Sequence, residues 1–127
     1  MPHFIIEHSS NLSDRHDLRA LGKIIADVTE KTGAFPLAGT RVRFHPCETY
    51  VIADDHPDNA FLSVIMRIGA GRDLETQQNA GQVVFDAICE FFADDLASGH
   101  FLVSVDMEIN DPQLSFKKNG ISPRLNR

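Results

Sequence analysis

A proline at position 2 is the first residue of this chain that could carry chemistry. Removal of Met1, which is usual before a small second residue, would leave a secondary amine at the start of the mature chain. An ordinary α-amino group has a pKa of about 7.7–8.0, and burial or nearby cations lower it. A neutral amine near pH 7 is a general base, so Pro2 is a candidate for that role. With Met1 retained, the nitrogen is an amide without base function, and most Met-Pro starts have no functional meaning.

Two arginines follow glycine-containing turns and could bind anions. Arg41 lies in an expected strand after Gly39, and Arg43 on the same face could take its role. Arg72 lies directly after Gly69-Ala70-Gly71, at the start of an expected helix. Guanidinium groups bind carboxylates in a bidentate manner, and helix N-termini also attract anions. Taken alone, either arginine is more often a solvated surface residue.

The remaining chemistry-bearing residues do not form a recognised site. His3 and His45 adjoin expected strands and are the alternative candidates for a base. No histidine pair has the spacing of a helical metal site, and Cys47 and Cys89 lack the CxxC spacing of a zinc site. The sequence Gly69-Ala70-Gly71 lacks the rest of a nucleotide-binding loop. We therefore expect neither a metal nor an organic cofactor.

Composition excludes several classes of protein. The chain has 127 residues, a size typical of one domain, and 43% of them are apolar. Its net charge of −6 argues against a nucleic-acid partner. It contains no apolar run near the ~20 residues of a membrane span, and its first residues do not resemble a signal peptide. We expect a cytoplasmic protein without a membrane or nucleic-acid partner.

Hydrophobic periodicity predicts the elements that would position these residues. Apolar residues at spacings of three and four indicate helices over 18–31 and about 74–96, and alternation indicates strands. The expected strands cover residues 3–8, 40–44, 50–53, 61–68 and 101–109. The chain is expected to be a single domain over 1–127, with similar halves at about 1–57 and 58–127. Phe4 and Arg15 in the first half correspond to Phe61 and Arg72 in the second, at an offset of 57.

The order of these elements predicts an α+β fold of type β-α-β-β-α-β. Two βαβ units can form one four-stranded core sheet with both helices on a single face. The chain has no third long helix for the other face, so self-association is expected to cover it.

Four stretches of the chain resemble the 5-carboxymethyl-2-hydroxymuconate delta-isomerase family, a branch of the tautomerase superfamily. They are residues 1–7 (MPHFIIE), 35–43 (FPLAGTRVR), 68–75 (IGAGRDLE) and 114–119 (LSFKKN). The resemblance implies a homotrimer without cofactor or metal, in which Pro2 is the catalytic acid and base. Arg41 and Arg72 are then expected to bind substrate carboxylates and to take part in catalysis by drawing electron density along the conjugated chain. It also implies a role in the degradation of homoprotocatechuate, an aromatic acid. The sequence departs from the family pattern at Pro46 and Cys47.

The function implied by this resemblance is proton transfer along a conjugated dienol, 5-carboxymethyl-2-hydroxymuconate, to give its 2-oxo isomer. Neutral Pro2 would remove the 2-hydroxyl proton and deliver it to carbon. Two arginines favour a substrate with several carboxylates. The alternatives are a tautomerase of another 2-hydroxydienoate or of a phenylenolpyruvate-like compound, and a non-catalytic trimeric binding protein of the same superfamily.

Overall fold

The computed structural model describes residues 1–125 and contains one four-stranded sheet with its helices. In chain order, the elements are β1 (His3–Ser9), α1 (Asn11–Arg15), α2 (Leu18–Lys31), η1 (Leu37–Gly39), β2 (Arg41–Cys47), β3 (Ala60–Ile68), α3 (Leu74–Phe91), α4 (Ala93–Ser98), β4 (Phe101–Ile109), η2 (Pro112–Leu114) and α5 (Ser122–Leu125).

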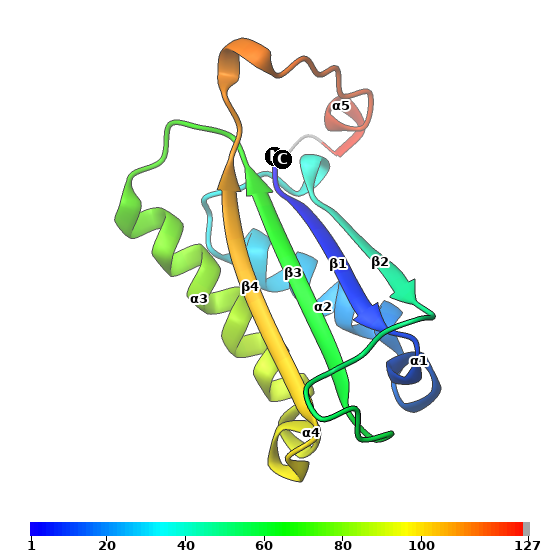
Figure 1. The fold of residues 1–127 in the computed structure, drawn as a ribbon. Coiled ribbons are helices and arrows are strands. Elements are labelled where there is room, and N and C mark those ends of the chain that lie inside the picture. The colour runs from blue at the N-terminus through cyan, green and yellow to red at the C-terminus, as the bar shows by residue number, and fades with distance from the viewer. Residues whose placement is uncertain (126–127) are drawn as a thin grey trace.

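The sheet has the strand order β2-β1-β3-β4. β1 pairs with β2 in parallel, β3 pairs with β4 in parallel, and the central pair β1 and β3 is antiparallel. Each parallel pair is joined through a long helix, α2 in the first half and α3 in the second. Both helices lie on one face of the sheet (Figure 1). This arrangement confirms the predicted β-α-β-β-α-β fold.

The core lies between the sheet and these two helices. Alternate residues of β1 and β3, such as Phe4 and Val64, are buried against the helices. The apolar stripe of α2 contributes Leu21 and Ile25, and that of α3 contributes Ile88. Aspartate side chains cap both helices: Asp17 accepts a hydrogen bond from the Ala20 amide at 3.2 Å, and Asp73 accepts one from the Thr76 amide at 2.8 Å. These caps fix where each helix begins.

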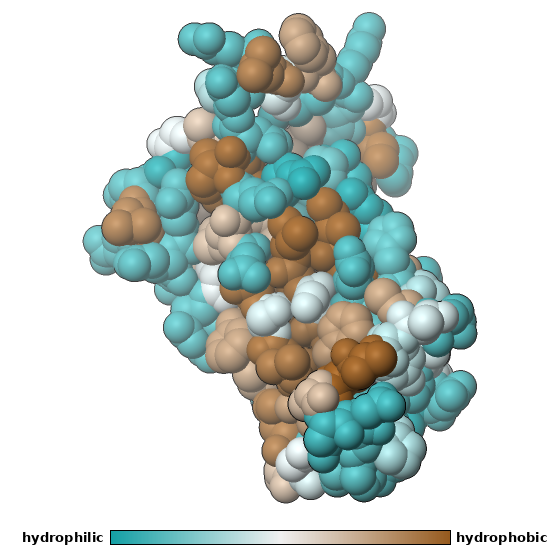
Figure 2. Space-filling view, in the orientation of Figure 1, coloured by the Kyte–Doolittle hydropathy of each residue, from teal (hydrophilic) through white to brown (hydrophobic). Residues whose placement is uncertain are grey.

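The opposite face of the sheet carries no helix. Its surface mixes apolar and polar side chains, and the apolar part gathers over the middle and lower part of the sheet (Figure 2). Leu102 on β4 is 60% exposed, while Arg67 and Glu108 form an ion pair at 3.0 Å between β3 and β4. None of the helices in residues 1–125 is long and apolar enough to span a membrane.

Two sequence expectations are wrong. Residues 50–53 do not form a strand, because the chain turns there: the Asp55 amide donates to the Ile52 carbonyl at 2.8 Å, and Ala53 and Asp55 have positive φ. The helix predicted over 74–96 is divided at Phe92, whose buried ring packs in the core while its backbone leaves the helical region. In addition, the strand expected over 40–44 continues to Cys47.

Candidate functional site at the start of the chain

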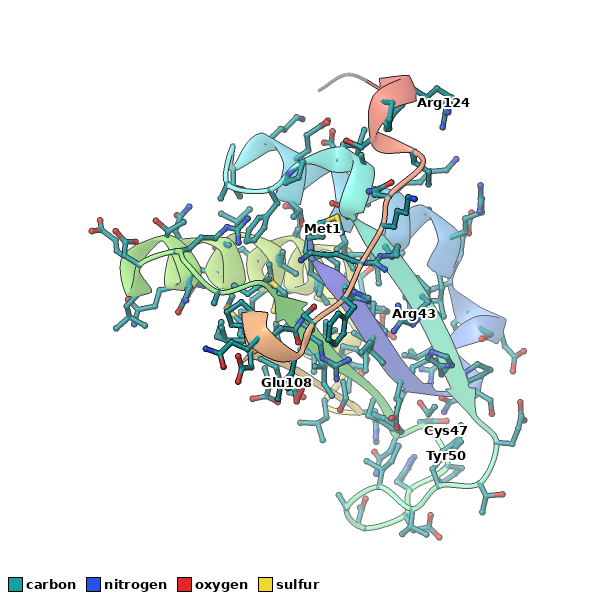
Figure 3. All side chains as sticks on the ribbon, turned by 90° about the horizontal axis from the view of Figure 1, so that it is seen from above. Met1, Arg43, Cys47, Tyr50, Glu108 and Arg124 are labelled. Atoms are coloured by element: carbon teal, nitrogen blue, oxygen red, sulfur yellow. The ribbon has the colours of Figure 1, made fainter. Side chains whose placement is uncertain are left out.

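The first residues of the chain lie at one end of the sheet, where β1 and β2 begin and β3 ends. Pro2 is buried, and its carbonyl accepts a hydrogen bond from the Arg41 amide at 3.2 Å. The segment that follows β4 returns to this end of the sheet (Figure 1), where the Asn119 amide nitrogen donates to the Ala38 carbonyl. Seen along the sheet, this segment passes beside Met1, while Arg43 lies further down β2 (Figure 3).

Arg41 is held beside His3 by the register of β1 and β2. Its Nη2 lies 2.6 Å from Nε2 of His3, and its Nε donates to the Gly39 carbonyl at 3.2 Å. A guanidinium group can only donate, so Nε2 of His3 is the acceptor. Nη1 of Arg43 lies 3.4 Å from the other ring nitrogen. Arg43 thus reaches the ring of His3 from the same strand as Arg41.

His3 is poorly suited to be the base. Burial, followed by the charges of Arg41, Arg43 and Arg67, lowers its pKa and keeps the ring neutral. The lone pair that could accept a substrate proton already accepts the Arg41 hydrogen bond. His45, the other alternative, pairs with Glu7 four residues along the β1–β2 ladder and lies away from the start of the chain.

Arg72 is fixed by backbone carbonyls rather than by an acidic side chain. Its Nε and Nη2 both donate to the Ala34 carbonyl, at 3.1 and 2.9 Å, and its Nη1 donates to the Gly69 carbonyl at 3.5 Å. The guanidinium carbon lies 4.2 Å from the centre of the Phe35 ring. These three bonds leave two of the five N–H groups without a protein partner among residues 1–125. Arg72 is therefore oriented by the protein and still able to bind an anion.

The amine at the start of the chain lies in a positive field. Partial burial lowers the pKa of the Met1 amine most, followed by the charges of Lys117, Arg72 and Arg41. The structure therefore brings Arg41 and Arg72, which are distant in the sequence, to the chain start that carries Pro2. Lys117 was missed by sequence reasoning, because the segment after residue 110 has no periodic pattern. The only signal was its place in the stretch LSFKKN.

A cavity of about 270 Å³ opens beside the start of the chain. It is lined by Met1, by residues 38–41 and by residues 117–121 of the C-terminal segment. The Asn119 amide nitrogen donates to the Ala38 carbonyl at 3.0 Å and joins these two walls. Met1 packs so closely on Gly39 that a Cβ atom at position 39 would overlap its side chain. Loss of Met1 would therefore enlarge this cavity next to the Pro2 nitrogen.

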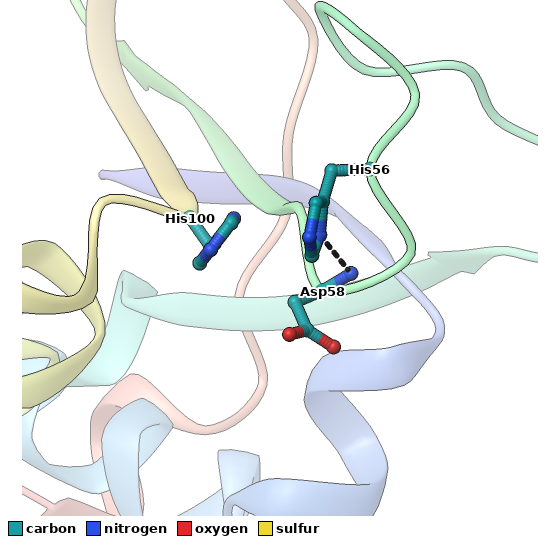
Figure 4. Close-up of side chains that lie close together, drawn as sticks. All are labelled: His56, Asp58 and His100. Atoms are coloured by element: carbon teal, nitrogen blue, oxygen red, sulfur yellow. Dashed lines mark hydrogen bonds between the residues drawn. The ribbon is translucent and has the colours of Figure 1, made fainter.

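A second group of titratable side chains lies at the opposite end of the sheet, where β3 and β4 begin. Ligand atoms of His56, Asp58 and His100 lie within 4.8 Å of one another (Figure 4). Nδ1 of His56 accepts from the Asp58 amide at 3.1 Å, and Nδ1 of His100 lies 3.0 Å from the Asn59 side-chain oxygen. The ring centroids of the two histidines lie 4.3 Å apart, with an interplanar angle of 31°. These contacts stabilise the 52–59 loop. None of the three residues lines the cavity beside Met1.

Comparisons with known proteins show what the whole chain is similar to. The family described as 5-carboxymethyl-2-hydroxymuconate isomerase matches residues 2–125. The chain is 40% identical over 121 residues to the 5-carboxymethyl-2-hydroxymuconate Delta-isomerase of Escherichia coli, which covers 95% of this chain and 96% of that protein.

Two solved structures extend the comparison. A 5-carboxymethyl-2-hydroxymuconate isomerase from Deinococcus radiodurans is 27% identical, with a TM-score of 0.90 over 99% of this chain and 95% of its own. A fused 4-OT protein solved as a symmetric trimer is 16% identical, with a TM-score of 0.69 over 98% and 99%. The second likeness shows a shared fold alone.

Proposed function

The chain belongs to the 5-carboxymethyl-2-hydroxymuconate isomerase family, an enzyme family, and from this premise we propose the substrate, the base and the assembly of this isomerase. The substrate is 5-carboxymethyl-2-hydroxymuconate and the product its 2-oxo isomer. The base is the amine of Pro2 after removal of Met1. The reaction belongs to the degradation of homoprotocatechuate and uses no metal or organic cofactor.

The proposed reaction moves one proton along a conjugated chain. The neutral Pro2 amine removes the proton from the 2-hydroxyl group, whose oxygen becomes the C2 carbonyl. The C2–C3 double bond moves to C3–C4, and the electron pair of the former C4–C5 double bond takes a proton from the Pro2 ammonium at C5. The amine returns to its neutral form, so the same group serves as base and then as acid.

The observation that carries this proposal is the meeting of Arg72, Arg41 and a partly buried chain start. Both cations and burial favour the neutral amine, as the lowered pKa of the Met1 amine illustrates at the adjacent position. The two free N–H groups of Arg72 would bind one carboxylate, and Arg41 would bind another. Well-placed donors of this kind lower a barrier by roughly 3–4 kcal/mol each, because negative charge spreads toward the carboxylates in the transition state.

The proposed assembly is a homotrimer formed through the helix-free face of the sheet. This face exposes apolar side chains, including Leu102, that two helices on the other side cannot cover. The fold is shared with a protein solved as a symmetric trimer. A closed ring would bury three copies of this face together.

An ultraviolet assay tests the proposed reaction. Protein whose mass shows that Met1 is absent would be mixed with 5-carboxymethyl-2-hydroxymuconate, and loss of the dienol absorbance would be followed. Phenylenolpyruvate would be tested in parallel. We expect turnover of the muconate and much slower turnover of phenylenolpyruvate. Preference for phenylenolpyruvate would change the proposed substrate, and inactivity with both would contradict the proposed reaction.

A further inference from the structure

The proposed substrate carries three carboxylates, two from the muconate and one from the carboxymethyl group. Arg41 and Arg72 account for two of them. The inference below rests on the proposed function and concerns the third carboxylate. Two further cations line the cavity beside the start of the chain, Lys117 and Lys118, in a segment that the sequence analysis did not assign to the site. Of the two, Lys117 is the one whose charge lowers the pKa of the Met1 amine.

Lys117 lies in the wall of this cavity opposite the η1 turn and Arg41. It is exposed and lies close enough to the start of the chain to act on the Met1 amine. Within residues 1–125, no carboxylate forms an ion pair with Lys117, Arg41 or Arg72. The neighbouring Arg67, by contrast, is paired with Glu108.

Among the described residues, these three cations have no acidic partner, although acidic residues are in excess in the chain. The protein has 18 acidic residues against 12 lysines and arginines. Three cations placed together repel one another unless an anion binds between them. Arg41 and Lys117 line the cavity, and Arg72 acts with them on the start of the chain, so this group of cations favours a ligand with several negative charges.

The C-terminal segment that carries Lys117 is fastened to the rest of the site. The Asn119 amide nitrogen donates to the Ala38 carbonyl, and its Oδ1 accepts from the Ile121 and Ser122 amides at 2.8 and 3.1 Å. Asn119 thus joins the segment to η1 and also organises the start of α5. Lys117, two residues away, is held at the cavity while its flexible side chain remains free to reach a ligand.

We propose that Lys117 binds the third carboxylate of the substrate and gives the enzyme its preference for a tricarboxylate over a dicarboxylate. Asn119 is the positioning residue that holds the segment bearing Lys117 in place. Removing Lys117 should lower kcat/KM for a tricarboxylate and leave kcat/KM for a dicarboxylate nearly unchanged, because the dicarboxylate would contact only the two arginines.

The test compares two substrates and three variants, all with Met1 removed. The substrates are 5-carboxymethyl-2-hydroxymuconate and 2-hydroxymuconate, which lacks the carboxymethyl group. Lys117→Ala should lower kcat/KM for the tricarboxylate by roughly 10- to 100-fold, the effect of one charge-assisted contact, mainly through KM. Its effect on 2-hydroxymuconate should be under about threefold, and Lys117→Arg should restore most of the loss. Lys31→Ala, which removes a lysine paired with Asp27 on α2, is the matched control. It should leave kcat/KM for both substrates unchanged.

A second measurement separates a direct role from a structural one. The Lys117 charge lowers the pKa of the Met1 amine, and we expect it to lower that of the adjacent Pro2 amine in Met1-free protein. In Lys117→Ala the low-pH limb of the activity profile should therefore move to higher pH, and Lys117→Arg should move it back. Equal loss on both substrates, or no loss on the tricarboxylate, would overturn the proposal.

Failure of the proposed function has a different signature. If wild-type protein turns over neither dienol, the reaction is wrong, and calorimetry still tests Lys117 with propane-1,2,3-tricarboxylate and pentanedioate as probes. Wild type should bind the tricarboxylate more tightly, and Lys117→Ala should lose that preference. Equal affinity of the wild type for both probes would contradict the proposal that Lys117 binds a third carboxylate.

Discussion

Pro2, Arg41 and Arg72 come from three separate parts of the sequence and meet at one end of the sheet. Each is ordinary alone: a common start, a strand residue and a residue before a helix. Their meeting depends on the β1–β2 register, which sets Arg41 beside His3, and on the Ala34 and Gly69 carbonyls that orient Arg72. Whether these residues can act together therefore depends on strand pairing and backbone contacts, which the residue types alone do not predict.

The Pro2 amine should control how activity varies with pH. Burial and the charges of Lys117, Arg72 and Arg41 lower the pKa of the Met1 amine. We expect the same causes to act on the adjacent Pro2 amine once Met1 is removed, so that its free base is populated at lower pH than for an ordinary α-amino group. Activity of Met1-free protein should rise with pH through the folded-state pKa of this amine and then level off, because the free base is the reactive form. A pH-rate profile measures this.

Protein with a retained Met1 or an N-terminal tag serves as the comparison for Pro2. Its proline nitrogen is an amide, and the Met1 side chain fills space against Gly39. It should be inactive and keep the same assembly, while Pro2→Ala should retain some activity through its primary amine. Equal activity of the tagged protein would remove Pro2 from the mechanism.

Arg72 and Arg41 should differ in their effects on stability. Arg72→Ala removes hydrogen bonds to the Ala34 and Gly69 carbonyls and the contact with Phe35, so the free energy of unfolding should fall by about 1–3 kcal/mol. Arg41 is exposed, and Arg41→Ala should change the free energy of unfolding by about 0.5 kcal/mol or less. Urea unfolding at one fixed protein concentration, together with kinetics, would check both. Wild-type kcat and KM in both variants would contradict the carboxylate-binding role.

At the scale of elements, periodicity predicted most of the fold. The stripe Leu18, Leu21, Ile25, Val28 predicted α2 correctly, because one face of that helix packs in the core. Alternation in 101–109 predicted β4 correctly, because alternate residues of that strand are partly buried against the core. The expectation of a strand at 50–53 was wrong because this apolar stretch leads into a turn, in which Ala53 has a positive φ. Lys117 and Asn119 could not be found by periodicity, since their segment is placed by side-chain hydrogen bonds rather than by an apolar face.

Asn119 should govern the order of the C-terminal segment. Asn119→Ala removes the hydrogen bond to the Ala38 carbonyl and the two caps at the Ile121 and Ser122 amides. Amides of residues 117–125 should exchange faster, KM for the tricarboxylate should rise, and the free energy of unfolding should change by under about 1.5 kcal/mol. Asn119→Asp keeps the acceptor for the two amides but loses the donor to Ala38. If Asn119→Asp exchanges and binds substrate like the wild type, the link to Ala38 does not hold the segment.

At the scale of the whole molecule, the two faces of the sheet differ in what covers them. α2 and α3 bury the side chains of one face. The other face exposes apolar side chains (Figure 2), and Leu102 on β4 is largely exposed. A protein of this size buries enough core between the sheet and two helices to fold, so the exposed face is better explained by assembly than by folding. The sequence analysis reached the same expectation from the number of helices alone.

Leu102→Glu should separate the subunits without unfolding them. Leu102 is 60% exposed in the single chain, so a charge there costs the isolated fold little, whereas in a trimer it would be buried among apolar side chains of other copies. Light scattering at micromolar concentration should give three times the chain mass for wild type and a smaller mass for Leu102→Glu, with circular dichroism unchanged. Ile24→Glu is the matched control, because Ile24 is 38% exposed on α2, on the other side of the sheet, and its variant should keep the wild-type mass. A wild-type monomer, or a Leu102→Glu protein with the wild-type mass, would show that the helix-free face is not the interface.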